Sequence, residues 1–152
     1  YTDQSGGIWS LARSDSGWVD RPLRSTRAME VMGVASPEDR WLAWATDASG
    51  RNEVRVAPMQ DPARSVQVSM DGGQPIRWDN GGGRLYYTDG QAIHSVAFRA
   101  DGPDLGSRRF EFPVPRDAKG WDVAPDGQRA YFIRGGAMVS ELVVAQGALP
   151  KY

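Results

Sequence analysis

One short motif occurs three times in this chain at a nearly constant spacing. Each copy places turn-forming residues directly before an apolar run, at residues 36–44, 79–87 and 124–132. The turn residues Pro37, Asn80 and Pro125 are separated by 43 and 45 positions. A second pattern ending in Thr-Asp recurs at residues 1–3, 45–47 and 87–89, with spacings of 44 and 42. A period in the low forties, built from turn and strand signals, predicts a β-propeller with four-stranded blades.

The central copy predicts the order of strands within a blade. Its expected strands are residues 31–35, 40–45, 53–57 and 65–69. The second of these is apolar on both faces, as in a strand covered by neighbouring blades. The third and fourth alternate with period two, and the fourth is expected to be the half-exposed outer strand. Hairpin and turn residues separate all four.

The other copies repeat this order, but the chain does not contain a whole number of blades. The remaining expected strands are residues 8–12, 21–24, 75–78, 84–87, 92–98, 108–112, 120–124, 130–133 and 138–145. No segment has the apolar stripe of a helix, so almost no helix is expected. We therefore predict an all-β partial β-propeller of about three and a half four-stranded antiparallel blades. The expected division is a blade remnant at 1–27, blades at 28–70 and 71–115, and an incomplete blade at 116–152.

Closed propellers have four or more blades. Two ways to complete the ring stay open: missing blades in a longer precursor, or a homo-oligomer in which a second copy supplies them.

Composition excludes several classes of function. The net charge of −1 gives no basic surface for nucleic acid. The absence of cysteine removes disulfides, thiolate catalysis and thiolate-bound zinc, and leaves the redox compartment open. No apolar run approaches the ~20 residues that a membrane-spanning helix needs, so no membrane-spanning segment is expected.

Three blocks resemble a known repeat. Residues 36–44 resemble the Ser-Pro-Asp-Gly-Arg-Trp-Leu-Ala-Tyr turn and strand of TolB-like, WD40-like bacterial propeller repeats. Residues 49–56 resemble the Ser-Gly-Arg-x-Glu-Val-Tyr-Val continuation, and residues 66–78 resemble the passage from an outer to an inner strand. Two turns depart from the pattern, with Glu38-Asp39 for Asp-Gly and Asn80-Gly81-Gly82 for Pro-Asp-Gly, but both keep turn-forming residues.

The last copy is similar, at residues 121–129 and 141–144, to propellers at the C-terminal end of some bacterial receptor-like Ser/Thr kinases and winged-helix regulators. This resemblance implies a sensing or protein-binding role. It is also the only reason to favour a periplasmic or extracytoplasmic location over a cytoplasmic one.

The residues that could carry chemistry do not form a catalytic pattern. His94 is the only histidine, and no Gly-x-Ser-x-Gly elbow exists to present a serine to it. The paired carboxylates Glu38-Asp39 and Asp101 with Asp104 are interpreted as turn residues. Residues 101–106 could offer oxygens to calcium but lack a regular acidic ladder, so a long outer loop is expected. The glycines of 72–73 and 81–83 are expected to form turns, because no phosphate-loop pattern surrounds them.

Tryptophan is the remaining candidate for a binding surface. The six tryptophans could include a binding platform, but Trp41, Trp44, Trp78 and Trp121 fall in expected strands and are interpreted as packing residues. Trp18, beside Gly17 in an expected turn, is the best candidate for an exposed contact.

We therefore predict a non-enzymatic module that binds a protein or peptide, with no catalytic residue, cofactor or metal, in a bacterial signalling protein. Two alternatives stay open: part of the propeller that gates a prolyl-oligopeptidase-type serine hydrolase, and a self-assembling half-propeller.

Overall fold

The computed structural model describes residues 7–135 and the backbone of residues 140–146. Within this part of the chain every regular element is a β-strand, and strands adjacent in sequence pair antiparallel within each sheet, which confirms the all-β prediction. The chain divides into two compact units, Tyr1–Gln74 and Pro75–Tyr152. None of the described segments forms a helix that could span a lipid bilayer.

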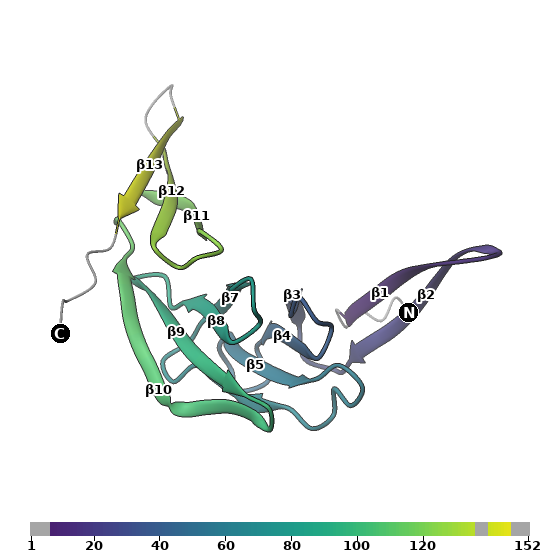
Figure 1. Ribbon diagram of the computed structural model, residues 1–152. Helices are drawn as coiled ribbons and strands as arrows, with labels where there is room; N and C mark the ends of the chain where they lie inside the picture. Colours follow the sequence, from purple (N-terminus) through teal and green to yellow (C-terminus); the bar gives the residue numbers. More distant parts are fainter. Residues whose placement is uncertain (1–6, 136–139, 147–152) are drawn as a thin grey trace. The chain divides into compact units, whose positions relative to one another are not determined.

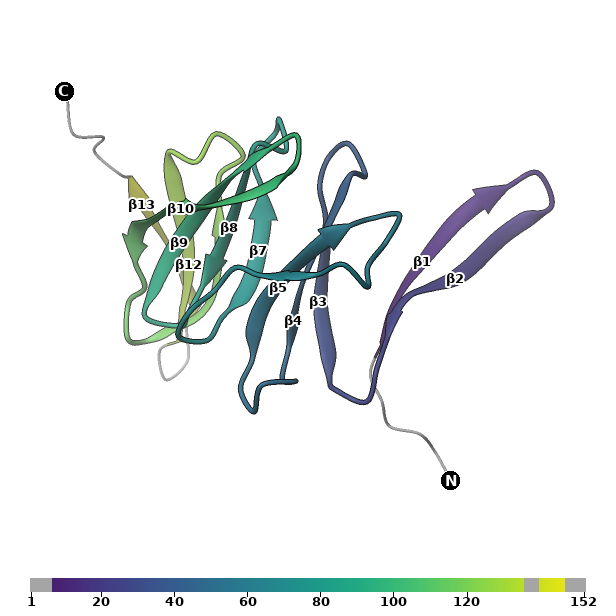
Figure 2. The same cartoon turned by 90° about the horizontal axis from the view of Figure 1, so that it is seen from below.

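The first unit contains a two-stranded hairpin and a four-stranded sheet (Figure 1). The hairpin pairs β1 (Gly7–Ser14) with β2 (Gly17–Ser25). The sheet has the order β3 (Glu30–Ala35), β4 (Trp41–Thr46), β5 (Glu53–Pro58) and β6 (Val66–Gln67). The tip of the hairpin extends away from this sheet (Figure 2).

The base of the hairpin is fixed by apolar packing. Ile8 and Leu23 contact a buried cluster formed by the side chains of Leu42, Trp44 and Ala57. A glycine at position 33 allows this close approach, because a Cβ there would lie 2.8 Å from Ile8 Cγ2.

The second unit contains a four-stranded and a three-stranded sheet that lie side by side (Figure 1). The first has the order β7 (Gln74–Trp78), β8 (Arg84–Thr88), β9 (Ala92–Arg99) and β10 (Gly102–Pro113). The second has the order β11 (Ala118–Val123), β12 (Arg129–Gly135) and β13 (Ser140–Gln146). One core joins them, formed by Tyr86, Ile93, Phe112, Val114, Val123, Ala130 and Phe132. The guanidinium of Arg77 also crosses between the sheets and donates to the carbonyl of Val123 at 3.0 Å.

The three copies of the sequence motif form the same turn. In each copy the first residue donates its N–H across the base of the turn to the carbonyl five positions later; the pairs are Ser36–Trp41, Asp79–Arg84 and Ala124–Arg129. The fourth residue donates back to the carbonyl of the first and has a positive φ of 52° at Asp39, 66° at Gly82 and 70° at Gly127. The repeat in the sequence is thus a repeat in backbone conformation.

Three expectations about local structure are wrong. The outer strand of the first sheet covers only Val66–Gln67, because Ser69 turns inward to donate its hydroxyl to Glu53. Residues 102–106 are not a loop: they belong to β10, and an irregularity between Asp104 and Arg109 absorbs the extra residues. Trp18 lies in β2 rather than in a turn.

Candidate functional site

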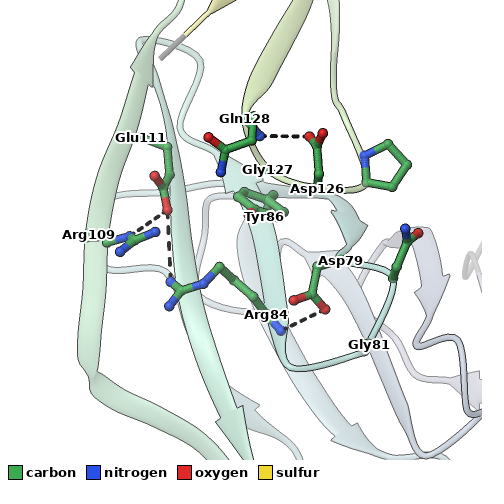
Figure 3. A pocket seen from close by; sticks show the side chains of 11 residues that line it. Asp79, Gly81, Arg84, Tyr86, Arg109, Glu111, Asp126, Gly127 and Gln128 are labelled. Carbon is green, nitrogen blue, oxygen red and sulfur yellow. Dashed lines mark hydrogen bonds and ion pairs between the residues drawn. The ribbon is translucent and has the colours of Figure 1, made fainter. Parts of the chain in front are cut away.

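A polar pocket of about 320 Å³ opens between the two sheets of the second unit (Figure 3). Two copies of the repeated turn form one side of it, and strands β8 and β10 form the other. The lining residues are Asp79, Asn80, Gly81, Arg84, Tyr86, Arg109, Glu111, Pro125, Asp126, Gly127 and Gln128.

Local hydrogen bonds fix the two turns that line the pocket. Asp79 Oδ1 accepts the backbone N–H of Arg84 at 3.2 Å, and Asp126 Oδ1 accepts the N–H of Gln128 at 2.9 Å. The N–H of Asn80 donates to the carbonyl of Pro125 at 3.3 Å and so connects one turn to the other. Each aspartate therefore uses one carboxylate oxygen to hold its own turn.

The opposite side is an ion-pair network on three adjacent strands. Glu111 Oε1 accepts from Arg109 Nε at 2.7 Å and from the Ser95 hydroxyl at 2.5 Å. Arg84 Nη1 donates to Ser95 Oγ at 2.7 Å and lies 3.9 Å from Glu111 Oε1. A single carboxylate thus lies between two guanidinium groups and neutralises part of their charge.

Tyr86 lies between the turns and the ion-pair network (Figure 3). Burial raises the pKa of Tyr86, and the negative charge of Glu111 raises it further, so the phenol stays protonated at neutral pH. Its hydroxyl occupies the space where a Cβ on residue 127 would lie. Gly127 is therefore required twice, by its positive φ and by this contact.

His94 lies in a hydrogen-bonded hairpin outside the pocket. Its Nε2 is 2.9 Å from Asp89 Oδ2, and its ring stacks on Tyr87 with a centroid separation of 5.4 Å. Burial raises the pKa of Asp89, but hydrogen bonds from Gln91, His94 and Ala92 outweigh it, and the pKa is lowered. The neighbouring hydroxyl of Ser95 bonds to Glu111 rather than to His94, so these residues form no nucleophile–base pair.

The acidic and glycine-rich segments have structural roles of their own. Glu38 pairs with Arg40 on the surface, and Asp104 pairs with Arg99 at 2.6 Å. Asp39 has the positive φ of its turn. Residues 81–83 form a turn as expected, but Gly81 also lines the pocket. No group of three acidic or imidazole side chains suited to a metal occurs in the part of the chain that the structure describes.

The tryptophans separate into buried and exposed groups. Trp44 and Trp78 are buried, and Trp41 and Trp121 are half-buried. Trp18 is 64% exposed, and the guanidinium of Arg13 lies over its ring at 5.1 Å. Trp9 is 58% exposed, although the neighbouring Ile8 packs on the core, because successive side chains of a strand point to opposite faces.

The residues that line the pocket were not singled out from the sequence as functional residues; Asn80, Gly81 and Pro125 were identified only as turn residues. Arg84 and Glu111 lie 27 positions apart and meet only because β8 and β10 flank β9. One signal was available: Arg109 and Glu111 alternate with apolar residues in an expected outer strand, which places both on one face.

Comparisons with known proteins identify the fold. No protein-family model matches the chain, and no curated protein matches it. Among solved structures, the TolB protein of Acinetobacter baumannii is similar over 92% of this chain and 35% of its own, with a TM-score of 0.69 and 11% identity. A putative TolB from Agrobacterium tumefaciens is similar over 92% of this chain and 58% of its own, with a TM-score of 0.59 and 14% identity.

Two other structures share the arrangement. A chain of the nidogen/laminin complex is similar over 94% of this chain and 55% of its own, with a TM-score of 0.64 and 15% identity. A chain from a structural study of two prolyl endopeptidases is similar over 95% of this chain and 27% of its own, with a TM-score of 0.53 and 12% identity. The present chain thus spans between about a quarter and three fifths of each of these four structures. The prediction of an all-β partial propeller is confirmed: in fold, this chain is part of a TolB-like β-propeller.

Proposed function

We propose that this chain is a non-catalytic propeller module that binds a protein or peptide at the pocket of the second unit. The observation that carries the proposal is the pocket itself: two hydrogen-bonded turns and a strand network hold charged groups around an open polar space. A site with fixed donors and acceptors binds without a large ordering cost. Loops held on a rigid sheet scaffold are where propellers and similar folds carry function.

The exposed side chains of the hairpin are proposed as an additional contact surface. Trp9, Leu11 and Trp18 are each more than half exposed. Tryptophan and arginine are enriched at the residues that dominate protein interfaces. The Arg13–Trp18 pair offers both types in one place.

The wider role is proposed from the resemblance of the repeats. We place the module in the sensory or interaction part of a bacterial signalling protein, outside the cytoplasm. The expected division into a blade remnant at 1–27, blades at 28–70 and 71–115 and an incomplete blade at 116–152 is kept as part of this proposal.

Selection of peptides on the 152-residue chain tests the binding function. Random dodecapeptides displayed on phage are selected on the chain, and enriched peptides are synthesised and titrated by fluorescence polarisation. Gln128→Trp places a large ring at the pocket mouth, and Gln91→Trp, at an exposed turn outside the pocket, is the matched control. We expect Gln128→Trp alone to weaken binding at least ten-fold. A selection with no enriched peptide, or peptides that bind both variants equally, would contradict the proposal.

A second candidate is part of the propeller that gates a prolyl-oligopeptidase-type hydrolase, favoured by the similarity to the prolyl endopeptidase structures. It requires a hydrolase domain with its own serine, aspartate and histidine. Reading the coding sequence around this segment distinguishes the two, because only the second candidate needs that domain in the same polypeptide.

A further candidate is self-assembly of a half-propeller, favoured by the exposed apolar side chains of the hairpin. Sedimentation at increasing protein concentration tests it. A single monomeric species throughout would remove this candidate.

A further inference from the structure

We propose that the pocket recognises one basic side chain of the partner, an arginine, held between the carboxylates of Asp79 and Asp126. This inference rests on the proposed binding function and assigns the chemical group that the pocket selects.

The charges that line the pocket favour a cation. Two guanidinium groups, Arg84 and Arg109, face three carboxylates, Asp79, Glu111 and Asp126, so the lining has one negative charge in excess. Glu111 already lies between the two arginines, at 2.7 Å from Arg109 Nε and 3.9 Å from Arg84 Nη1. The excess negative charge therefore resides on the two aspartates.

The two aspartates are placed to share one ligand. One comes from each of the two turns, and both lie on the side of Tyr86 opposite Glu111 and Arg109 (Figure 3). Each uses Oδ1 for a backbone hydrogen bond of its own turn. Asp126 Oδ2 is 3.7 Å from the exposed Arg129 guanidinium, which is a weak contact in water. The Oδ2 atoms of both aspartates can therefore accept hydrogen bonds from a ligand.

Tyr86 supplies a further polar group at the same place. The residue as a whole is only 4% exposed, and it lines the pocket. Its hydroxyl oxygen is not among the buried unpaired polar atoms of the described residues, so it is accessible from the pocket and can accept a hydrogen bond from a ligand there.

An arginine fits these groups better than other side chains. Its guanidinium is planar and has five N–H donors, so it can bond to two separated carboxylates and a phenol oxygen together. An acidic side chain would add to the existing negative excess and would compete with Glu111 for Arg84 and Arg109. A neutral amide would leave the two aspartates without a counter-charge.

The test uses blocked amino acids as probes of the ¹⁵N-labelled 152-residue chain. N-acetyl-arginine methylamide is titrated against its neutral isostere, N-acetyl-citrulline methylamide, and against N-acetyl-glutamate methylamide. The readout is the chemical shift of the backbone amides of Gly81, Gly127 and Gln128. We expect the arginine probe to bind with a dissociation constant in the millimolar range. The dissociation constant of the citrulline probe should be about five-fold higher.

Substitution of the aspartates tests their role. Asp79→Asn and Asp126→Asn keep the oxygen that holds each turn and remove the charge, and each is expected to weaken the arginine probe about two- to five-fold. Asp101→Asn, at an exposed turn outside the pocket, is the matched control and should change nothing. Equal binding of citrulline, stronger binding of glutamate, unchanged binding in both variants, or no shift of these amides at about 50 mM probe would overturn the inference.

Failure of the inference can be distinguished from failure of the proposed function. If selected peptides bind and Gln128→Trp abolishes their binding while the arginine probe does not bind, the function stands and the inference is wrong. If the arginine probe binds as expected but no peptide is ever selected, the basic-group site stands and the peptide-binding function is wrong.

Discussion

Asp39, Gly82 and Gly127 occupy the same position in the three turns, and all three have a positive φ. Glycine adopts this conformation freely, whereas a residue with a Cβ is strained in it. The first turn has Glu38-Asp39 in place of Asp-Gly. It keeps the same conformation, so Asp39 adopts a strained positive φ. The sequence predicted a turn at each of the three sites. It did not predict that Asp39 would be strained, because the strain depends on the backbone angle of that residue in the folded chain.

Asp39→Gly is expected to stabilise the chain. Removing the side chain relieves the strained conformation, and the greater freedom of glycine in the unfolded chain offsets part of the gain. We expect the free energy of unfolding in urea to rise by about 0.5 kcal/mol. Glu38→Gly, at the preceding position without a positive φ, should lower it. Stabilisation by both substitutions, or by neither, would be inconsistent with a strained Asp39.

Gly127→Ala is expected to destabilise the chain through two separate effects. The new Cβ is strained by the positive φ and collides with the Tyr86 hydroxyl, which together should lower the free energy of unfolding by about 2–3 kcal/mol. Gly90→Ala, with a φ of 90° and no atom within 4 Å of its Cβ, should show the backbone cost alone.

A double-mutant cycle separates the collision from the backbone cost. In a Tyr86→Phe background the hydroxyl is absent, and the closest remaining atom is ring carbon Cζ at 3.0 Å from the new Cβ. Gly127→Ala should then cost about 1–2 kcal/mol, less than in the unchanged chain but not less than Gly90→Ala. If the costs of Gly127→Ala and Tyr86→Phe simply add, the contact with the hydroxyl does not matter.

At the level of elements, turn chemistry and hydrophobic pattern predicted the strands well, and the errors have local causes. The outer strand of the first sheet was expected at 65–69, but it ends at Gln67, and beyond it the Val68 N–H still donates to β5, to the Val54 carbonyl at 2.8 Å. The reason is Glu53, which is almost completely buried and draws Ser69 and the Gly72 backbone toward its carboxylate. The alternation of apolar and polar residues predicted a strand over 65–69. It gave no sign of the buried charge of Glu53 on the neighbouring strand, so it did not predict where the strand would end.

The ionised carboxylate of Glu53 is therefore expected to make the free energy of unfolding depend on pH in the acid range. Burial raises the pKa of Glu53, but hydrogen bonds from Ser69 and Arg51, the Arg51 charge and the Gly72 N–H outweigh it, and the pKa is lowered. The pKa of Glu53 is lower in the folded chain than in the unfolded chain, so the ionised carboxylate stabilises the fold. This stabilisation is fully present above the usual glutamate pKa, about 4.3, and is lost as the pH falls through the folded-state pKa.

Glu53→Gln should lower the free energy of unfolding by about 1–3 kcal/mol at pH 7, because it removes a charge that accepts several hydrogen bonds. The difference from the unchanged chain should shrink as the pH falls below about 4. Urea unfolding followed by tryptophan fluorescence across this range measures it. Glu38→Gln, on a surface pair, is the control and should cost less than about 0.5 kcal/mol at every pH. A pH-independent effect of Glu53→Gln would show that its charge is not what holds Ser69 and Gly72.

For the whole chain, the repeat predicted the fold but not the site. The fold follows from short-range signals that recur, such as Pro37 before one strand and Asp126-Gly127 before another. The pocket instead depends on which strands become neighbours: Arg84, Ser95 and Glu111 meet across three strands, and Asp126 comes from the next sheet. Apart from the alternation that places Arg109 and Glu111 on one face, these residues look like ordinary polar positions in the sequence, and strand order and register are needed to bring them together.

The fold depends on three motif copies that form the same turn ahead of the same kind of strand. Amide hydrogen exchange measured by NMR on the whole chain is the sharpest test of this equivalence. We expect comparably slow exchange at Ser36, Asp79 and Ala124, whose N–H groups cross the base of each turn, and at Asp39, Gly82 and Gly127 within it. Slow exchange in one copy and rapid exchange in the other two would contradict it.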